Sequence, residues 1–92
     1  MTDLFTDGNA LAGPLDEIFT VEMTMARGQC AGCGRTGTVA EMRVYGMSPG
    51  MVARCPGCDE VLMRLVRTPD RAFLDLRGVV ALEIPMPPDS GR

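Results

Sequence analysis

The sequence predicts a small α+β domain that is mainly antiparallel β-sheet, with one helix near its N-terminus. Two Cys-x-x-Cys elements are separated by a spacer long enough for a hairpin, and short apolar runs alternate with turns that contain glycine or proline. The chain has 92 residues, enough for one domain. A domain of this size buries only a small hydrophobic core and often needs an additional cross-link for stability, so we expect a bound metal to stabilise the fold.

The first regular element should be a helix that follows a flexible end at residues 1–6. Asp7 is a good N-cap, and Pro14 conflicts with an unbroken helix because proline lacks a backbone donor. We therefore predict either a kinked helix over residues 8–19 or a helix that begins at Pro14. The apolar stripe with helical spacing consists of Leu11, Leu15, Ile18 and Phe19.

The next elements should be strands that bring the two cysteine pairs together. Residues 20–26 alternate between apolar and polar side chains, which predicts a half-buried strand leading into the first pair. Residues 39–46 predict a second strand, and a turn at residues 48–50 connects it to residues 51–54, just before the second pair. These two strands should form a hairpin.

Three further strands are expected after the second cysteine pair. They cover residues 61–66, 72–76 and 79–84, with turns between them. Residues 86–92 are proline-rich and should form a disordered tail. We therefore expect a single domain over residues 7–85.

The strongest motif is the pair of Cys-x-x-Cys elements, which predicts one shared metal site. Two intervening residues let both sulfurs of a pair reach one ion from a tight turn, and glycines around them let backbone N–H groups point at the thiolates. Four thiolates saturate a tetrahedral ion and leave no open position for water or substrate. We predict one Zn²⁺ per chain, in a structural role. The ligands are Cys30, Cys33, Cys55 and Cys58.

The composition argues against catalysis. The chain has no histidine and no lysine, so it lacks a histidine general base, a Ser-His or Cys-His dyad, a Schiff-base lysine and a P-loop lysine. Residues 32–37 match the Gly-x-Gly-x-x-Gly pattern of dinucleotide-binding sites. That motif requires a strand before it and a helix after it, whereas here it begins within the first cysteine turn, so we expect the match to be a coincidence. We therefore expect no enzyme activity and no small-molecule substrate.

The two cysteine turns resemble those of zinc ribbons and of rubredoxin, which share the Cys-x-x-Cys-Gly and Cys-Pro-x-Cys forms. The likeness covers residues 30–34 and 55–58. Rubredoxins bind iron and transfer electrons, so an Fe(Cys)₄ electron carrier is the alternative. This chain departs from rubredoxin because it lacks an aromatic cluster for the metal and has Asp59 where a glycine would close the second turn. The expected fold is thus a zinc-ribbon or rubredoxin-like antiparallel β fold.

A wider resemblance spans most of the chain. The segments at residues 7–13, 30–34, 54–58 and 75–78 look like those of a family of small bacterial four-cysteine proteins of unknown function. The resemblance implies a cytosolic, single-domain protein with one ribbon. It implies no activity.

Charge and exposed side chains give only weak hypotheses about a binding surface. Residues 1–25 are acidic, whereas residues 26–77 carry most of the arginines, a pattern too weakly basic to predict a nucleic-acid-binding protein. Two methionines beside the predicted hairpin tip either form an adaptable binding surface or pack into the core. The candidate binding residues are Arg64, Arg67, Arg71, Met47 and Met51.

The leading hypothesis is a non-catalytic domain whose structural zinc supports an interaction surface. A protein partner is the first choice and nucleic acid the second. The alternatives are the iron electron carrier and an accessory protein that passes zinc onward. No stretch is long and apolar enough to span a membrane, and the N-terminus does not resemble a signal peptide, so we expect a cytoplasmic protein with reduced cysteines.

Overall fold

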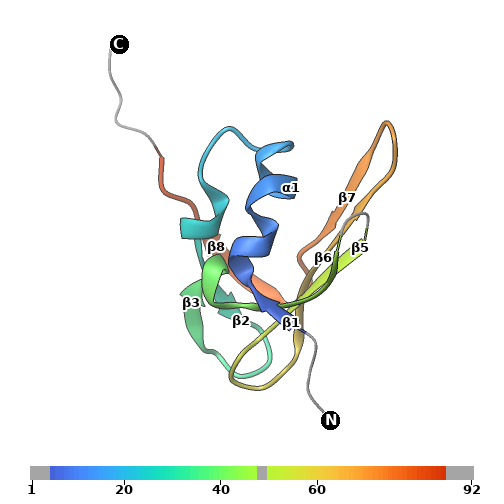
Figure 1. Cartoon of the computed structure of the whole chain (residues 1–92). Helices are drawn as coiled ribbons and strands as arrows, with labels where there is room; N and C mark the ends of the chain where they lie inside the picture. Colours follow the sequence, from blue (N-terminus) through green and yellow to red (C-terminus); the bar gives the residue numbers. More distant parts are fainter. Residues whose placement is uncertain (1–4, 48–49, 87–92) are drawn as a thin grey trace, which may run out of the picture.

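The computed structural model of the chain describes residues 5–47 and 50–86 and contains two antiparallel sheets (Figure 1). The larger sheet has five strands in the order β1-β4-β5-β6-β7. The smaller sheet has three strands in the order β3-β2-β8. The predicted class, mainly antiparallel β with a short N-terminal helix, is confirmed.

The N-terminal segment forms β1 (Phe5–Asp7), the 3₁₀ helix η1 (Gly8–Leu11) and the helix α1 (Ala12–Asp16). The Asp7 side chain accepts a hydrogen bond from the N–H of Asn9, as expected for an N-cap. The helical stretch ends earlier than predicted. Pro14 lies in the first turn of α1, where its missing N–H costs no helical hydrogen bond. Within the described residues, no helix is long and apolar enough to cross a membrane.

Part of the expected flexible end belongs to the larger sheet. Phe5 pairs with Tyr45 and Thr6 pairs with Val44, both in β4. These two positions therefore correct the prediction for residues 1–6, of which residues 1–4 lie outside the described part of the chain.

The strand predicted at residues 20–26 is wrong. Residues of this segment form the 3₁₀ helix η2 (Met23–Met25), in which Met23 and Thr24 are buried and Met25 is exposed. The Thr24 hydroxyl donates a hydrogen bond to the carboxylate of Glu22. Such local side-chain bonds offer an alternative to strand pairing, so the alternation of residue types misled the prediction.

The strand that does lead into the first cysteine pair is β2 (Arg27–Cys30), and its pairing with β3 (Thr36–Thr38) was not foreseen. Residues 39–46 divide into η3 (Val39–Glu41) and β4 (Arg43–Met47) instead of forming one strand. β4 pairs antiparallel with β5 (Gly50–Arg54), which confirms the predicted hairpin. Residues 48–49 of its predicted turn lie outside the described residues.

The last strands agree with the prediction. They are β6 (Val61–Arg67), β7 (Ala72–Asp75) and β8 (Val79–Glu83). β6 and β7 form a hairpin that extends away from the smaller sheet in Figure 1, whereas β8 joins the smaller sheet beside β2. Of the predicted tail at residues 86–92, only Met86 is described, and its side chain is exposed.

One buried cluster joins the N-terminal helical turns to both sheets. Alternation along β6 turns Met63 and Leu65 inward, while Arg64 and Val66 face solvent. The core is aliphatic and methionine-rich, in a chain of which only 4% of the residues are aromatic. Its members are Leu11, Leu15, Met23, Ala26, Cys30, Val39, Met42, Val44, Met51, Ala53, Cys55, Leu62, Met63 and Leu65.

The helical turn η1 rests directly on η3 through Gly8. A Cβ atom added to Gly8 would lie 1.6 Å from the carbonyl oxygen of Val39, so only glycine fits this contact. In α1, by contrast, a Cβ added to Gly13 would meet nothing within 4 Å.

We predict that Gly8→Ala destabilises the protein and Gly13→Ala does not. The first change forces η1 off η3, and overpacking of this kind costs about 1–3 kcal/mol. The second places a better helix former in an open position and should gain up to about 1 kcal/mol. Urea unfolding followed by circular dichroism measures both. Equal midpoints for Gly8→Ala and the unsubstituted chain would contradict the close contact.

Candidate metal centre

The structure brings the four predicted ligands together. The Sγ atoms of Cys30, Cys33, Cys55 and Cys58 all lie within 4.8 Å of one another. The Sγ atoms of Cys30 and Cys58 are 3.6 Å apart, and those of Cys33 and Cys55 are 3.7 Å apart. A tetrahedron with metal–sulfur bonds of ~2.3 Å has edges of about 3.8 Å, so the four thiols can hold a single ion.

The first cysteine turn continues directly from β2. The N–H of Cys30 donates to the carbonyl of Arg35, and the N–H of Gly34 donates to the carbonyl of Cys30, both at 2.9 Å. The N–H of Gly32 points at Cys30 Sγ, 3.3 Å away. Gly34 has φ of +80°, a left-handed conformation that glycine adopts without strain.

The second turn repeats the first, position by position. The N–H of Cys55 donates to the carbonyl of Glu60 (2.8 Å), and the N–H of Asp59 donates to the carbonyl of Cys55 (2.9 Å). The N–H of Gly57 points at Cys55 Sγ, 3.3 Å away. Each turn therefore directs a glycine N–H at the sulfur of its own first cysteine.

Asp59 occupies the place that Gly34 holds in the first turn. Its φ of 68° is left-handed, which aspartate tolerates better than most residues. Arg54 supports this conformation because its Nη1 donates to the Asp59 carbonyl at 2.9 Å and lies 3.8 Å from the Asp59 carboxylate. The departure from glycine seen in the sequence therefore leaves the turn geometry intact.

Each turn also packs against the glycine of the other. A Cβ added to Gly57 would lie 3.1 Å from the Arg35 side chain, and one added to Gly32 would lie 2.9 Å from the Glu60 side chain. Arg35 and Glu60 each stand two residues after the last cysteine of their own turn. The sequence analysis missed both residues, although their matching positions relative to the cysteines could have indicated a shared role.

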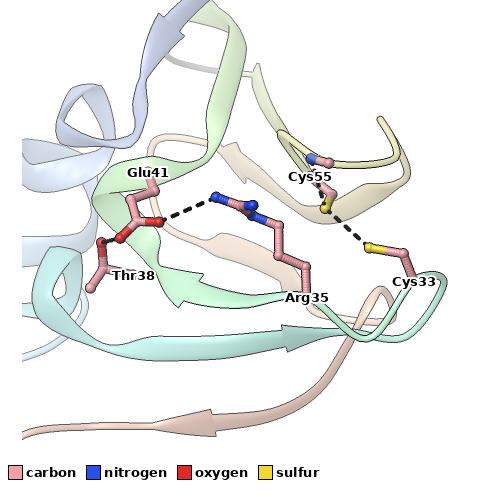
Figure 2. Close-up of polar contacts among 6 residues, drawn as sticks. Cys33, Arg35, Thr38, Glu41 and Cys55 are labelled. Carbon is pink, nitrogen blue, oxygen red and sulfur yellow. Dashed lines mark hydrogen bonds and ion pairs between the residues drawn. The ribbon is translucent and has the colours of Figure 1, made fainter.

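Arg35 links the centre to η3. Figure 2 shows its guanidinium reaching toward Glu41, with Nη2 3.6 Å from the carboxylate. The Thr38 hydroxyl donates to the same carboxylate at 3.2 Å. Arg35 lines the same cavity as Cys30 and Cys55. Its cation would therefore lie near the net negative charge of a divalent ion bound by four thiolates.

The four thiols differ in exposure and acidity. Cys30 and Cys55 are buried, whereas Cys33 and Cys58 are exposed. Hydrogen bonding from the Cys33 backbone, aided by Gly32 and the neighbouring thiols, lowers the pKa of Cys30 to about 7 against the opposing effect of burial. The Glu60 backbone lowers the pKa of Cys58, but desolvation of the sulfur and the other three thiols outweigh it and raise that pKa to about 12. A metal ion must therefore displace a proton from Cys58 at neutral pH.

A turn at residues 75–78 fastens the first cysteine turn to β6. The N–H of Ala31 donates to the carbonyl of Gly78 (2.9 Å), and the N–H of Gly78 donates to the carbonyl of Leu62 (3.2 Å). A Cβ at Gly78 would lie 2.0 Å from the carbonyl oxygen of Val61. The Asp75 carboxylate accepts from the N–H of Arg77 and closes the turn. The segment at residues 75–78 therefore has a structural role beside the cysteine turns.

The three candidate binding arginines do not share one surface. Arg64 is exposed on the outward face of β6, whereas Arg67, at the end of the same strand, points the other way and forms an ion pair with Glu17. Arg71 is exposed in the turn between β6 and β7. Any binding by these residues stays a prediction.

Of the two alternatives for the methionines, core packing is the one that the structure shows for Met51, which is therefore not a binding residue. Met51 is only 5% exposed and belongs to the core, because alternation in β5 turns it inward. It therefore cannot form an adaptable surface. Met47 ends β4, and its side chain lies outside what the structure describes.

The sequence analysis missed a group of aromatic and arginine side chains on the outer face of the larger sheet. The rings of Phe5 and Tyr45 have centroids 5.7 Å apart. The guanidinium of Arg43 lies 5.1 Å from the Phe5 ring centre, and that of Arg54 lies 5.7 Å from the Tyr45 ring centre. Phe5 fell in the predicted flexible end, so no signal in the sequence placed it beside Tyr45.

We predict that Asp59→Gly keeps the metal centre and its stability, whereas Asp59→Val weakens both. Glycine takes the left-handed conformation freely, but a β-branched residue there costs of order 1–3 kcal/mol. Metal affinity measured by competition with a chromophoric chelator distinguishes the variants. If Asp59→Val bound metal as tightly as Asp59→Gly, the left-handed turn would not matter for the site.

Comparison with known proteins shows the family. A family model described as a family of unknown function (DUF6510) matches residues 2–87, and the chain belongs to that family. Searches of curated proteins and of solved structures found no match.

Proposed function

We propose that this family member is a non-catalytic domain in which one Zn²⁺, bound by the four cysteines, holds the fold so that one face can bind a protein partner. The observation that carries the proposal is the paired geometry of the two cysteine turns. Each aims a glycine N–H at a cysteine sulfur, at 3.3 Å, from a turn closed by matching backbone hydrogen bonds. Such preorganised thiolate sites are typical of structural zinc.

Zinc is favoured over iron by the surroundings of the centre. The cavity beside Cys30 and Cys55 has a volume of about 20 Å³, and the described residues that line it include no aromatic side chain. Rubredoxin-like centres pack aromatic residues around the metal. The aromatic rings of Phe5 in β1 and Tyr45 in β4 instead pack against each other, tilted by 51°.

A structural role follows from saturation of the metal. Four sulfurs leave a tetrahedral ion no position for water or substrate. The cavity beside the centre has room for about one water molecule, which is too little space for a substrate. With no histidine or lysine in the chain, the described surroundings of the centre supply no general base of those types.

The proposed partner surface is the outer face of the larger sheet. It presents Phe5, Tyr45, Arg43, Arg54 and Arg64. Aromatic residues and arginine are enriched at the centres of protein interfaces, whereas lysine, which this chain lacks, is depleted.

A protein is favoured over nucleic acid because the charges on this face are balanced. Arg54 is already paired with Asp59, Asp75 stands opposite Arg64 in the sheet, and Asp7 stands opposite Arg43. A nucleic-acid site needs an excess of cations to bind phosphates. Because paired cysteines persist as thiolate ligands in reducing compartments, we place the protein in the cytoplasm.

The metal is tested by analysing protein purified without added metal. We predict one zinc per chain, and we predict that strong chelation abolishes the circular dichroism spectrum of the folded chain, since metal-binding free energy is folding free energy in domains of this kind. Cys55→Ser, which replaces a buried ligand, should bind metal far more weakly, whereas Thr36→Ser in β3 serves as the matched control and should not change metal content.

Two outcomes would replace the proposal. One iron per chain, with colour that bleaches on reduction, would indicate an electron carrier. Loss of zinc to a weak chelator, with the circular dichroism spectrum still that of the folded chain, would indicate an accessory protein that transfers zinc. The exposure of Cys33 and Cys58 favours this alternative.

The partner surface is tested by affinity capture with variants. We predict that the double variant Phe5→Ala, Arg43→Ala recovers a specific protein at least about tenfold less than the unsubstituted chain, because aromatic and arginine residues dominate such interfaces. Arg27→Ala in the smaller sheet should have no effect. Recovery that disappears on nuclease treatment would instead identify nucleic acid as the partner.

A further inference from the structure

The outer edge of β7 is an open position of the larger sheet. β7 ends the strand order, so its outward backbone N–H and C=O groups have no ladder partner among the described strands. Figure 1 shows the β6–β7 hairpin standing clear of the smaller sheet. Natural edge strands usually carry lysine, proline or a bulge that discourages pairing, and residues 72–75 have none of these.

Large apolar side chains are exposed to solvent at this edge. Phe73 is 62% exposed, and its cross-strand neighbour Val66 is 42% exposed. An exposed apolar strand edge of this kind marks a pairing site.

Alternation places charged residues on both sides of Phe73. Side chains two residues apart share a face of a strand, so Arg71, Phe73 and Asp75 lie along one face, while Ala72 and Leu74 lie along the other. Arg71 continues the ladder beyond the strand because its carbonyl accepts from the N–H of Thr68 at 2.9 Å.

We propose that β7 pairs with β7 of a second copy of this chain, antiparallel, with Phe73 opposite Phe73 of the partner subunit. This register sets Arg71 against the partner's Asp75 and Asp75 against the partner's Arg71. On the other face, Ala72 meets the partner's Leu74. Both faces of the edge are therefore complementary to themselves, as a two-fold dimer requires.

Other registers lack this complementarity. A shift by two residues places Phe73 against the partner's Asp75 or the partner's Arg71, which removes the aromatic pair and both ion pairs. A parallel arrangement places Arg71 beside the partner's Arg71, so like charges face each other. The sequence of the edge thus favours one antiparallel arrangement.

The dimer would join the two larger sheets into one continuous sheet. The outer faces of the two copies would then form a single surface. This inference goes beyond the proposed function and does not depend on it, because neither the metal ligands nor Phe5, Tyr45 and Arg43 lie at the β7 edge.

Sedimentation of the metal-loaded protein over a range of concentrations tests the dimer. We predict that the unsubstituted chain dimerises and that Phe73→Ala raises the dimer dissociation constant by at least about tenfold, as expected for the central aromatic pair. Val80→Ala is the matched control, because Val80 is 64% exposed on β8, the edge of the smaller sheet. It should leave the dissociation constant unchanged.

Charge reversal tests the register. Arg71→Asp and Asp75→Arg each place like charges together in a homodimer, so each should sediment as a monomer. Mixed in equal amounts they restore both ion pairs, so they should form a heterodimer. Because Asp75 also closes the turn to Arg77, metal content and circular dichroism check that this variant folds.

The outcomes decide the proposal even if Asp75→Arg does not fold, because Phe73→Ala and Arg71→Asp leave that turn intact. A chain that stays monomeric at the highest concentration, or a dimer that neither variant weakens, would overturn it. A dimer weakened by Val80→Ala instead would assign the contact to β8.

Discussion

The central constraint on the structure is the junction of its two sheets at the cysteine centre, which a bound metal ion would cross-link. The first cysteine turn continues from β2 of the smaller sheet, and the second connects β5 to β6 of the larger sheet. One ion bound by both turns would therefore fix the two sheets to each other. The matching hydrogen bonds of the two turns mean that both sheets present their sulfurs in the same way.

Backbone contacts around the centre extend this cross-link. Ala31 bonds to Gly78, and Gly78 bonds to Leu62, so the first turn, the segment before β8 and the strand β6 form a continuous chain of hydrogen bonds. Val39 donates to the carbonyl of Ala26, which ties η3 to the start of β2 at 2.9 Å. Gly8 then brings η1 onto η3. The helical N-terminus is thus positioned by the same framework as the metal ligands.

The sequence predicted those features that depend on local residue types. The Cys-x-x-Cys turns, the cap at Asp7, the β4–β5 hairpin and the three last strands follow from spacing, capping and periodicity. It failed where a contact distant in sequence decides the structure. Residues 20–26 alternate like a strand but form η2, and β3 is too short and polar to be recognised before its pairing with β2 is known.

The candidate surfaces were harder to predict than the metal site for the same reason. Metal ligands are revealed by residue type and spacing, whereas a surface depends on which strands become neighbours. Phe5 and Tyr45 are far apart in the chain and meet only because β1 pairs with β4. Arg64 and Arg67 are close in the chain but face opposite sides of β6.

Amide hydrogen exchange before and after removal of the metal tests most directly whether the centre holds the two sheets together. The account predicts that metal removal exposes amides throughout β2, β8, β5 and β6 as well as in the cysteine turns. Loss of protection confined to residues 30–34 and 55–60, with both sheets still protected, would contradict it and would make the metal a local feature of an independently stable fold.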